Sequence, residues 1–214
     1  ITMAALLHID HNGNALVPEI IKDSGLSIDN WIRKYLKAYL SPILHCFYMH
    51  DLVFMPHGEN IIMVLENNIP EYILLKDITE EACILSDEIV LPEHLKRMYA
   101  PVPEDVKLLS VFTDMFDGFF RFLAPILEEH ADYKETSFWR LVAENIEDYQ
   151  EAFPQFSEKF NTYDLFANDF KLSCLNRLQL NNHKQMIDLD DPVALLQFAG
   201  TLKNPIAQFK NQEV

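Results

Sequence analysis

His57, Asn60 and Asp77 are the residues of this 214-residue chain whose types and spacing could carry chemistry. The first two lie in a polar stretch between two apolar runs, and the aspartate follows the next apolar run. Asparagine offers a neutral carbonyl oxygen and aspartate an anionic one, and Mg²⁺ is held by such oxygen ligands, usually together with nucleotide phosphates and water. A histidine beside them can donate to a phosphate or to a developing oxyanion. The pattern therefore indicates a candidate magnesium and phosphate site.

Three short strands are expected to position these residues. The apolar, partly β-branched runs that predict them are 51–55, 61–65 and 71–78. The polar loop 56–60 separates the first two, so it points the histidine and the asparagine out of one end. A turn at 67–70 sends the third strand back antiparallel, which brings the aspartate to the same end. Spacing alone also leaves open a plain turn at 56–60, in which the asparagine side chain bonds its own backbone.

A helix is predicted at 29–45, before the strands. Trp31, Tyr35 and other large apolar residues recur there at three- and four-residue spacing. Pro42 is placed to kink or stop this helix. A further short strand is expected around 88–91.

Beyond Pro103 the chain is expected to be mainly helical. Pro103 suits a first helical turn, and four phenylalanines extend a broad apolar face: Phe112, Phe116, Phe119 and Phe120. Further helices are predicted at 137–149 and 163–178. A last helix is capped by Asp191 and closed by Gly200.

These elements predict an α+β fold. Residues 1–100 supply a helix and a small antiparallel sheet, and residues 101–214 supply a mainly helical part. No linker divides the two, so one domain over 1–214 is expected. The most apolar stretch, 108–127, is interrupted by Asp114 and two other charged residues, so it does not predict a membrane span.

Composition excludes several classes of function. The chain has 17 Lys+Arg and 33 Asp+Glu, a net charge of −16, which disfavours nucleic acid and anionic membranes as partners. Hydrophobic residues make up 49% of the chain, enough for a buried core. The cysteines Cys46, Cys83 and Cys174 are odd in number and widely spaced, so no disulfide framework or zinc site is indicated and a cytoplasmic location is expected.

Several separated motifs together resemble one enzyme family. They are His57-Gly-Glu-Asn60, Lys76-Asp77-Ile78, the Trp31-x-x-x-Tyr35 helix, Phe170-Lys171 before Leu175-Asn-Arg177-Leu178, and the closing Gly200-x-Leu-x-Asn-Pro205. In this order they are similar to the C-terminal domain of the NRPS-independent siderophore synthetases, the aerobactin-synthetase-like family. The resemblance covers essentially the whole chain. It implies a palm-type subdomain of a longer synthetase.

Within that family the motifs look most like the branch that joins and closes hydroxamate units. Its products include desferrioxamine-, alcaligin-, putrebactin- and bisucaberin-type siderophores. Citrate-using branches more often carry Arg-Asp-Phe where this chain has Lys76-Asp77-Ile78. Lys76 keeps the positive charge but lacks the bidentate fork of arginine.

The resemblance implies an ATP-dependent amide-forming ligase. ATP activates a carboxylate of an N-hydroxy-N-succinyl-diamine as an acyl-adenylate with release of pyrophosphate, and an amine then displaces AMP. The implied site roles are a phosphate contact for His57 and Mg²⁺ and phosphate positioning for Asn60 and Asp77. A nucleotide contact is implied for Lys76, and a weaker metal or supporting role for Glu66.

Two further cations, Lys171 and Arg177, are candidates for binding a substrate carboxylate or phosphate. Solvent-facing positions on an amphipathic helix are an equal alternative for both.

The resemblance also implies partners. Family members are several hundred residues longer, and their N-terminal part carries most of the ATP-binding segment. We therefore expect this portion to need that part of the same synthetase, to be inactive alone, and to belong to a homodimer. Alternatives are a citrate-using synthetase, a ferric-siderophore reductase, which would need a cysteine cluster, and a non-catalytic interaction or dimerisation module.

Overall fold

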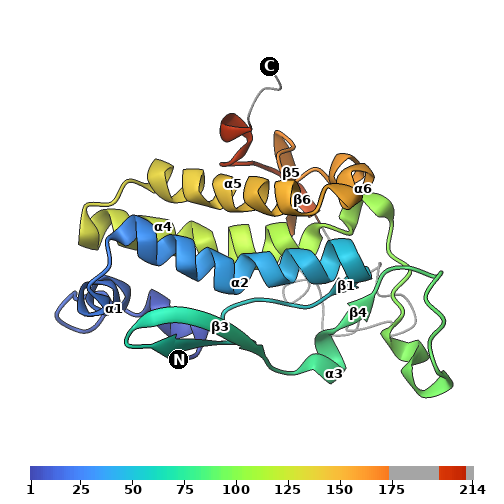
Figure 1. The fold of residues 1–214 in the computed structure, drawn as a ribbon, viewed down its shortest axis with the longest axis horizontal. Helices are drawn as coiled ribbons and strands as arrows, with labels where there is room; N and C mark the ends of the chain where they lie inside the picture. Colours follow the sequence, from blue (N-terminus) through green and yellow to red (C-terminus); the bar gives the residue numbers. More distant parts are fainter. Residues whose placement is uncertain (174–197, 211–214) are drawn as a thin grey trace.

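Helices form the centre of the structure, and small antiparallel hairpins lie on either side of them (Figure 1). The computed structural model describes residues 1–173 and 198–210. The α-helices are α1 (Leu16–Ser24), α2 (Ile28–His50), α3 (Ile78–Glu81), α4 (Arg121–Ala131), α5 (Glu135–Ala152) and α6 (Ser157–Thr162). The strands are β1 (Leu52–Val53), β2 (Ile61–Glu66), β3 (Ile69–Leu75), β4 (Cys83–Ile84), β5 (Asp169–Ser173) and β6 (Phe198–Lys203). This arrangement confirms the α+β class.

The remaining helical segments are one π-helix and several short 3₁₀ turns. The π-helix is η4 (Ser110–Phe120), which runs directly into α4. The 3₁₀ turns are η1 (Met3–Leu7), η2 (Glu93–Met98), η3 (Glu104–Val106), η5 (Pro154–Phe156) and η7 (Ala207–Phe209). None of the described helices combines the length and the apolar character needed to cross a membrane.

The long helix α2 organises the core. Ser27 caps its start, because the Ser27 side chain accepts a hydrogen bond from the Asn30 N–H at 3.3 Å. The prediction of a helix here is confirmed, but α2 does not stop at Pro42 and continues to His50. Residues after the proline, including Leu44 and Tyr48, are fully buried, and their packing holds the helix together where one backbone hydrogen bond is lost.

Aromatic rings join α2 to the π-helix and to α5. Phe120 is fully buried and lies within 6.5 Å, centroid to centroid, of six rings: Tyr35, Tyr39, Phe116, Phe119, Phe138 and Trp139. Edge-to-face pairs dominate this cluster, as the charge distribution of aromatic rings favours. The apolar face predicted beyond Pro103 is thus helical and buried, in an uncommon π-helical form.

The β2–β3 hairpin packs on α2. Its turn contains Asn67 and Asn68, both in the left-handed region (φ 51° and 64°), which suits a two-residue turn between twisted strands. The Trp31 indole N–H donates to the Asn68 carbonyl at 2.8 Å and ties the turn to α2. Ile61 pairs with Leu75 at the other end of the hairpin. The two predicted strands are confirmed, but the second begins at Ile69, inside the predicted turn, and ends at Leu75, because α3 begins at Ile78.

The first predicted strand pairs differently from the expectation. β1 is only two residues long and pairs antiparallel with β4 rather than with β2. The strand expected at 88–91 is wrong, because that stretch lies in and after a turn and the partner strand is β4. The Leu85 N–H donates to the Asp51 carbonyl at 2.8 Å and extends the β1–β4 pairing.

The C-terminal part is also less helical than expected. The helix predicted at 163–178 is wrong over 163–173, where a turn leads into β5. The side-chain amide of Asn204 donates to the carbonyls of Leu165 and Ala167. A residue distant in the sequence therefore supplies the hydrogen-bond donors that a helix would otherwise supply to these carbonyls. Gly200 does not close a helix, because it lies within β6 with φ 114°. The expected cap at Asp191 lies outside the described residues.

Candidate functional site

The open end of the β2–β3 hairpin brings four of the predicted site residues together. Asn60 precedes β2, and its carbonyl accepts a hydrogen bond from the Lys76 N–H at 2.9 Å, so the strand pairing continues one step beyond Ile61 and Leu75. Asp77 follows Lys76 directly and begins α3. His57 contacts Asn60, because its Nε2 lies 3.1 Å from the Asn60 amide nitrogen. The predicted placement of the histidine, the asparagine and the aspartate at one end is confirmed.

The Asn60 side chain is oriented so that its oxygen remains unpaired. The residue is only 6% exposed. Its amide nitrogen contacts the Met55 carbonyl at 3.2 Å and His57 Nε2 at 3.1 Å. The Met55 carbonyl needs a donor, which fixes the nitrogen on that side. Within residues 1–173 and 198–210 no donor contacts Asn60 Oδ1, so this oxygen can coordinate a cation.

Both ring nitrogens of His57 have partners. Nε2 lies 3.1 Å from the Asn60 amide nitrogen, and Nδ1 accepts a hydrogen bond from the Glu59 N–H at 3.4 Å. These contacts orient the imidazole beside Asn60 at the open end of the hairpin.

Two contacts hold the loop that carries His57. The buried Tyr39 hydroxyl of α2 donates a hydrogen bond to the Pro56 carbonyl. On the other side, the Gly58 carbonyl accepts from the Ala4 N–H at 2.8 Å. A Cβ at position 58 would lie 3.0 Å from the Ala4 Cα, closer than side chains normally approach. Close packing against Ala4 therefore favours glycine at this point of the motif.

Lys76 and Asp77 give the site mixed charge. The Lys76 ammonium donates to the Glu59 carbonyl at 3.1 Å and lies 4.0 Å from the Asp77 carboxylate. Both side chains are about half exposed, so each can turn toward a ligand. Asp77 adopts a left-handed backbone (φ 54°), which aspartate tolerates better than most residues.

The chemistry of these donors fits a magnesium–nucleotide better than a bare metal ion. The described residues contain no group of three or more His, Cys, Asp or Glu side chains that could hold a metal. One amide oxygen and one carboxylate are what Mg²⁺ takes from a protein when phosphates and water supply its other ligands.

Glu66 does not belong to this site. It is the last residue of β2, at the turn of the hairpin, and pairs with Ile69. The strand separates it from Asn60 by roughly 20 Å. The geometry therefore contradicts the metal or supporting role in this site that the resemblance implied for Glu66.

Lys171 lies on the other side of the helices, on β5 (Figure 1). Its ammonium is paired with Asp105 and lies 4.9 Å from the centre of the Phe198 ring. The residue lines a groove of about 390 Å³ together with Phe112 and Tyr163. It is on a strand rather than the predicted helix, and it is not near His57. Arg177 lies outside the described residues.

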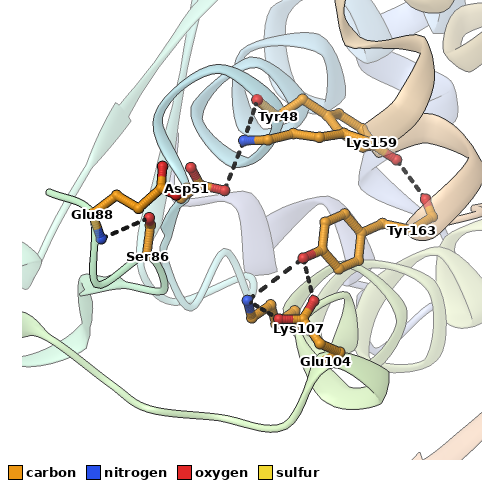
Figure 2. Close-up of polar contacts among 8 residues, drawn as sticks. All are labelled: Tyr48, Asp51, Ser86, Glu88, Glu104, Lys107, Lys159 and Tyr163. Atoms are coloured by element: carbon orange, nitrogen blue, oxygen red, sulfur yellow. Dashed lines mark hydrogen bonds and ion pairs between the residues drawn. The ribbon is translucent and has the colours of Figure 1, made fainter.

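A polar cluster fastens the end of α2 beside this groove (Figure 2). The Lys159 ammonium from α6 donates to the Tyr48 carbonyl at 3.0 Å and pairs with Asp51 at 2.8 Å. The Tyr48 hydroxyl donates to the Tyr163 carbonyl at 2.8 Å, and the Tyr163 hydroxyl donates to Glu104. The cluster links α2, α6 and η3, and its charges are largely satisfied by one another.

Asp114 and Glu81 are functional candidates that sequence reasoning missed. Burial, reinforced by the negative charge of Glu81, raises the pKa of Asp114 to about 7. Glu81 closes α3, four residues after Asp77, and its Oε2 is buried without a hydrogen-bond partner among the described residues. The pKa of Tyr39 is raised mainly by burial, and the negative charge of Asp114 raises it further. The signal for Asp114 in the sequence is its acidic side chain within the apolar run 108–127.

Comparison with known proteins places the chain in a family. Residues 29–188 match the family model described as a ferric iron reductase FhuF-like transporter, which is more than half of the chain. The chain belongs to the FhuF-like family. The FhuF-like chain is 51% identical over 209 residues to putrebactin synthase of Shewanella sp. (strain MR-4), covering 98% of this chain and 33% of that protein. It is 29% identical to the rhizobactin siderophore biosynthesis protein RhbF of Rhizobium meliloti (strain 1021), with 97% and 35% coverage.

Solved structures share the fold of this FhuF-like chain. Aerobactin synthetase IucC from a hypervirulent pathotype of Klebsiella pneumoniae superposes with a TM-score of 0.81 at 24% identity, covering 97% of this chain and 36% of that one. ATP-bound aerobactin synthetase IucA from the same pathotype gives a TM-score of 0.66 at 14% identity, with 96% and 36% coverage. The chain thus spans about a third of the length of the relatives it matches. It therefore matches one portion of these longer relatives.

Replacing Tyr39 with phenylalanine tests the fastening of the motif loop. The substitution leaves the buried Pro56 carbonyl without its donor, so we expect the free energy of unfolding to fall by about 1–3 kcal/mol in urea titration. Tyr72→Phe is the matched control, because the Tyr72 side chain is 54% exposed and its hydroxyl has no partner in the described part of the chain. Equal stability of both variants would contradict the fastening role.

Asp114→Asn tests the buried acid. The pKa of Asp114 is raised in the folded state, so ionisation opposes folding increasingly as pH rises from about 4 to above 7. An asparagine at position 114 does not ionise, so the variant does not lose stability in this way as pH rises. We expect its stability relative to the parent to improve by roughly 2–3 kcal/mol between pH 5 and pH 8, measured by urea unfolding. A pH-independent difference would mean that Asp114 ionises normally.

Proposed function

We propose that this chain is the portion of an ATP-dependent siderophore synthetase that positions magnesium–ATP for activation of a hydroxamate substrate. The carboxylate of an N-hydroxy-N-succinyl-diamine attacks the α-phosphorus of ATP, and pyrophosphate leaves. An amine then attacks the resulting acyl-adenylate, loses a proton and displaces AMP, which forms an amide. Repetition of the reaction joins units, and attack within one chain closes a macrocycle.

One observation carries this proposal: the hairpin register sets Asn60 opposite Lys76 and beside Asp77, with Asn60 Oδ1 unpaired. The 51% identity to putrebactin synthase supports the hydroxamate substrate, and the ATP-bound relative supports the nucleotide. We expect this chemistry in the cytoplasm, where ATP is available.

Each residue of the site has a proposed task. Asn60 Oδ1 and the Asp77 carboxylate hold the metal–nucleotide, and Mg²⁺ when bound neutralises phosphate charge. His57, oriented by its contacts with Asn60 and Glu59, contacts a phosphate oxygen. Lys76 can leave the Glu59 carbonyl and pair with the same phosphates. Positioning and electrostatic stabilisation are therefore the main contributions of this chain.

Lys171 keeps a proposed role at a separate position. Its groove beside Phe112 and Tyr163 could take the apolar stem of a diamine, while the ammonium exchanges Asp105 for a substrate carboxylate. The exchange is feasible because the pair is partly exposed, where such ion pairs contribute about 0–1 kcal/mol.

Two alternatives differ from the proposed function. One has a different substrate, and the other has a different activity. Aerobactin synthases of Vibrio mimicus and Escherichia coli are 29% and 26% identical to this chain, so a citrate-type substrate is the rival within the same chemistry. The family description names a ferric iron reductase. The three scattered cysteines do not supply the cluster that an iron–sulfur reductase needs.

Asp77→Ala in the full-length synthetase tests the proposal. We expect kcat/KM for AMP and pyrophosphate release with N-hydroxy-N-succinyl-putrescine or -cadaverine to fall at least about 100-fold, because an anionic ligand of the metal–nucleotide is lost. Glu71→Gln is the matched control, because Glu71 is an exposed carboxylate on β3. Undiminished turnover in the Asp77 variant would remove this residue from the mechanism, and turnover with citrate alone would favour the rival substrate.

A further inference from the structure

Residues 1–4 pair with the strand that follows the motif loop. The Met63 N–H donates to the Ile1 carbonyl at 2.8 Å, and the Ile1 nitrogen donates to the Met63 carbonyl at 2.9 Å. Thr2 forms an antiparallel bridge with Ile62. Strand β2 therefore has backbone partners on both of its edges, β3 on one side and this N-terminal segment on the other.

The same segment is anchored in the core. Met3 and Leu6 of η1 are fully buried. Besides β2, η1 packs against α1 and α4. Buried apolar side chains of this size fix the backbone that carries them, because moving them would open a cavity. The N-terminal segment is therefore a fixed support for the strand and the loop beside it.

Ala4 connects this support to the candidate site. Its N–H belongs to the first turn of η1, where a helix leaves its own N–H groups without partners. It donates instead to the Gly58 carbonyl at 2.8 Å. A Cβ added at position 58 would lie 3.0 Å from the Ala4 Cα and 3.1 Å from the Ala4 Cβ. The two backbones are thus about as close as a glycine allows.

Gly58 lies in the middle of the motif, so its position affects the residues on either side of it. His57 precedes Gly58, and Glu59 follows it and donates from its N–H to His57 Nδ1 at 3.4 Å. His57 Nε2 in turn contacts the Asn60 amide. A displacement of Gly58 would therefore move the imidazole and the Asn60 side chain relative to Asp77.

We propose that Ala4 is a positioning residue for the nucleotide site: its contact with Gly58 holds the motif loop in the geometry that binds magnesium–ATP. The inference rests on the proposed function, because it assigns a determinant of nucleotide affinity to a residue outside the site. Ala4 acts through the backbone of the loop and not through contact with the reacting atoms. Its effect falls on KM for MgATP rather than on kcat, since displaced ligands weaken the ground state and the transition state alike.

Gly58→Ala in the full-length synthetase tests the contact. The added Cβ pushes the loop away from Ala4, so we expect KM for MgATP to rise at least about fivefold while kcat stays within about twofold. Ala4→Gly is then introduced into the same variant, because it removes the Ala4 Cβ, one of the crowding atoms. The double variant should lower KM again by at least about twofold, as expected for two residues in direct contact.

Ala5→Gly in the Gly58→Ala variant is the matched control. It makes the same substitution at the next residue of η1, whereas the three atoms nearest to the added Cβ all belong to Ala4. A general change in the stability of η1 would follow from either glycine substitution. Equal rescue by both, rescue by neither, or an unchanged KM in Gly58→Ala would each overturn the inference.

Hydrogen exchange gives a second reading that does not depend on the folding of a variant. In the full-length wild-type synthetase, saturating MgATP should slow exchange of the Ala4 amide at least about threefold, because coupling between the nucleotide and this contact is reciprocal. The Asn14 amide, bonded to Asp10 in an exposed turn, is the internal control and should not change. Unchanged exchange at Ala4 with nucleotide bound would contradict the positioning role.

Nucleotide binding by Asp77→Ala separates failure of this inference from failure of the proposed function. Unchanged MgATP affinity in that variant, measured by calorimetry, would defeat the proposed function whatever the result at Ala4. Loss of affinity in Asp77→Ala, together with no response of the Ala4 amide, would defeat the positioning role of Ala4 and leave the proposed function standing.

Discussion

The hydrogen bond from the buried Tyr39 hydroxyl to the Pro56 carbonyl links the core of the molecule to its chemistry. The Tyr39 ring packs against Phe119 and Phe120 of the π-helix, while its hydroxyl reaches the residue before His57. A phenol buried to this extent needs a partner, and the motif loop supplies it. The position of the loop therefore follows from how α2 packs against η4. The Gly58–Ala4 contact closes the loop from the other side.

The proposed function requires the site to bind a polyanion on an acidic chain. The groups at the open end of the hairpin for this task are the His57 imidazole and the Lys76 ammonium, beside the oxygens of Asn60 and Asp77. Burial raises the pKa of Asp114, so ionisation of this carboxyl lowers stability at neutral pH. Residues that reduce stability in this way often lie near functional sites.

The placement of His57, Asn60 and Asp77 at one end of the hairpin could be predicted because it depends on local patterns. The apolar runs around Asn67 and Asn68 specify the hairpin, and the hairpin alone brings Asp77 to Asn60. The failures depend on distant partners. Nothing near 163–173 in the sequence signals that the Asn204 side chain will satisfy that backbone, so a helix was predicted where β5 forms. Likewise Glu66 is near Asn60 in sequence, yet an extended strand carries it to the far end, and Asp114 was seen only as an interruption of an apolar run.

The central claim is that Asn60 and Asp77 hold one metal–nucleotide. Anomalous diffraction from crystals of the full-length synthetase with Mn²⁺ and ATP tests it most directly, because the metal position is then observed independently of turnover. The account predicts a manganese peak within about 2.0–2.6 Å of both Asn60 Oδ1 and an Asp77 carboxylate oxygen. Bound nucleotide with its metal coordinated by other residues, and neither of these side chains within reach, would contradict it.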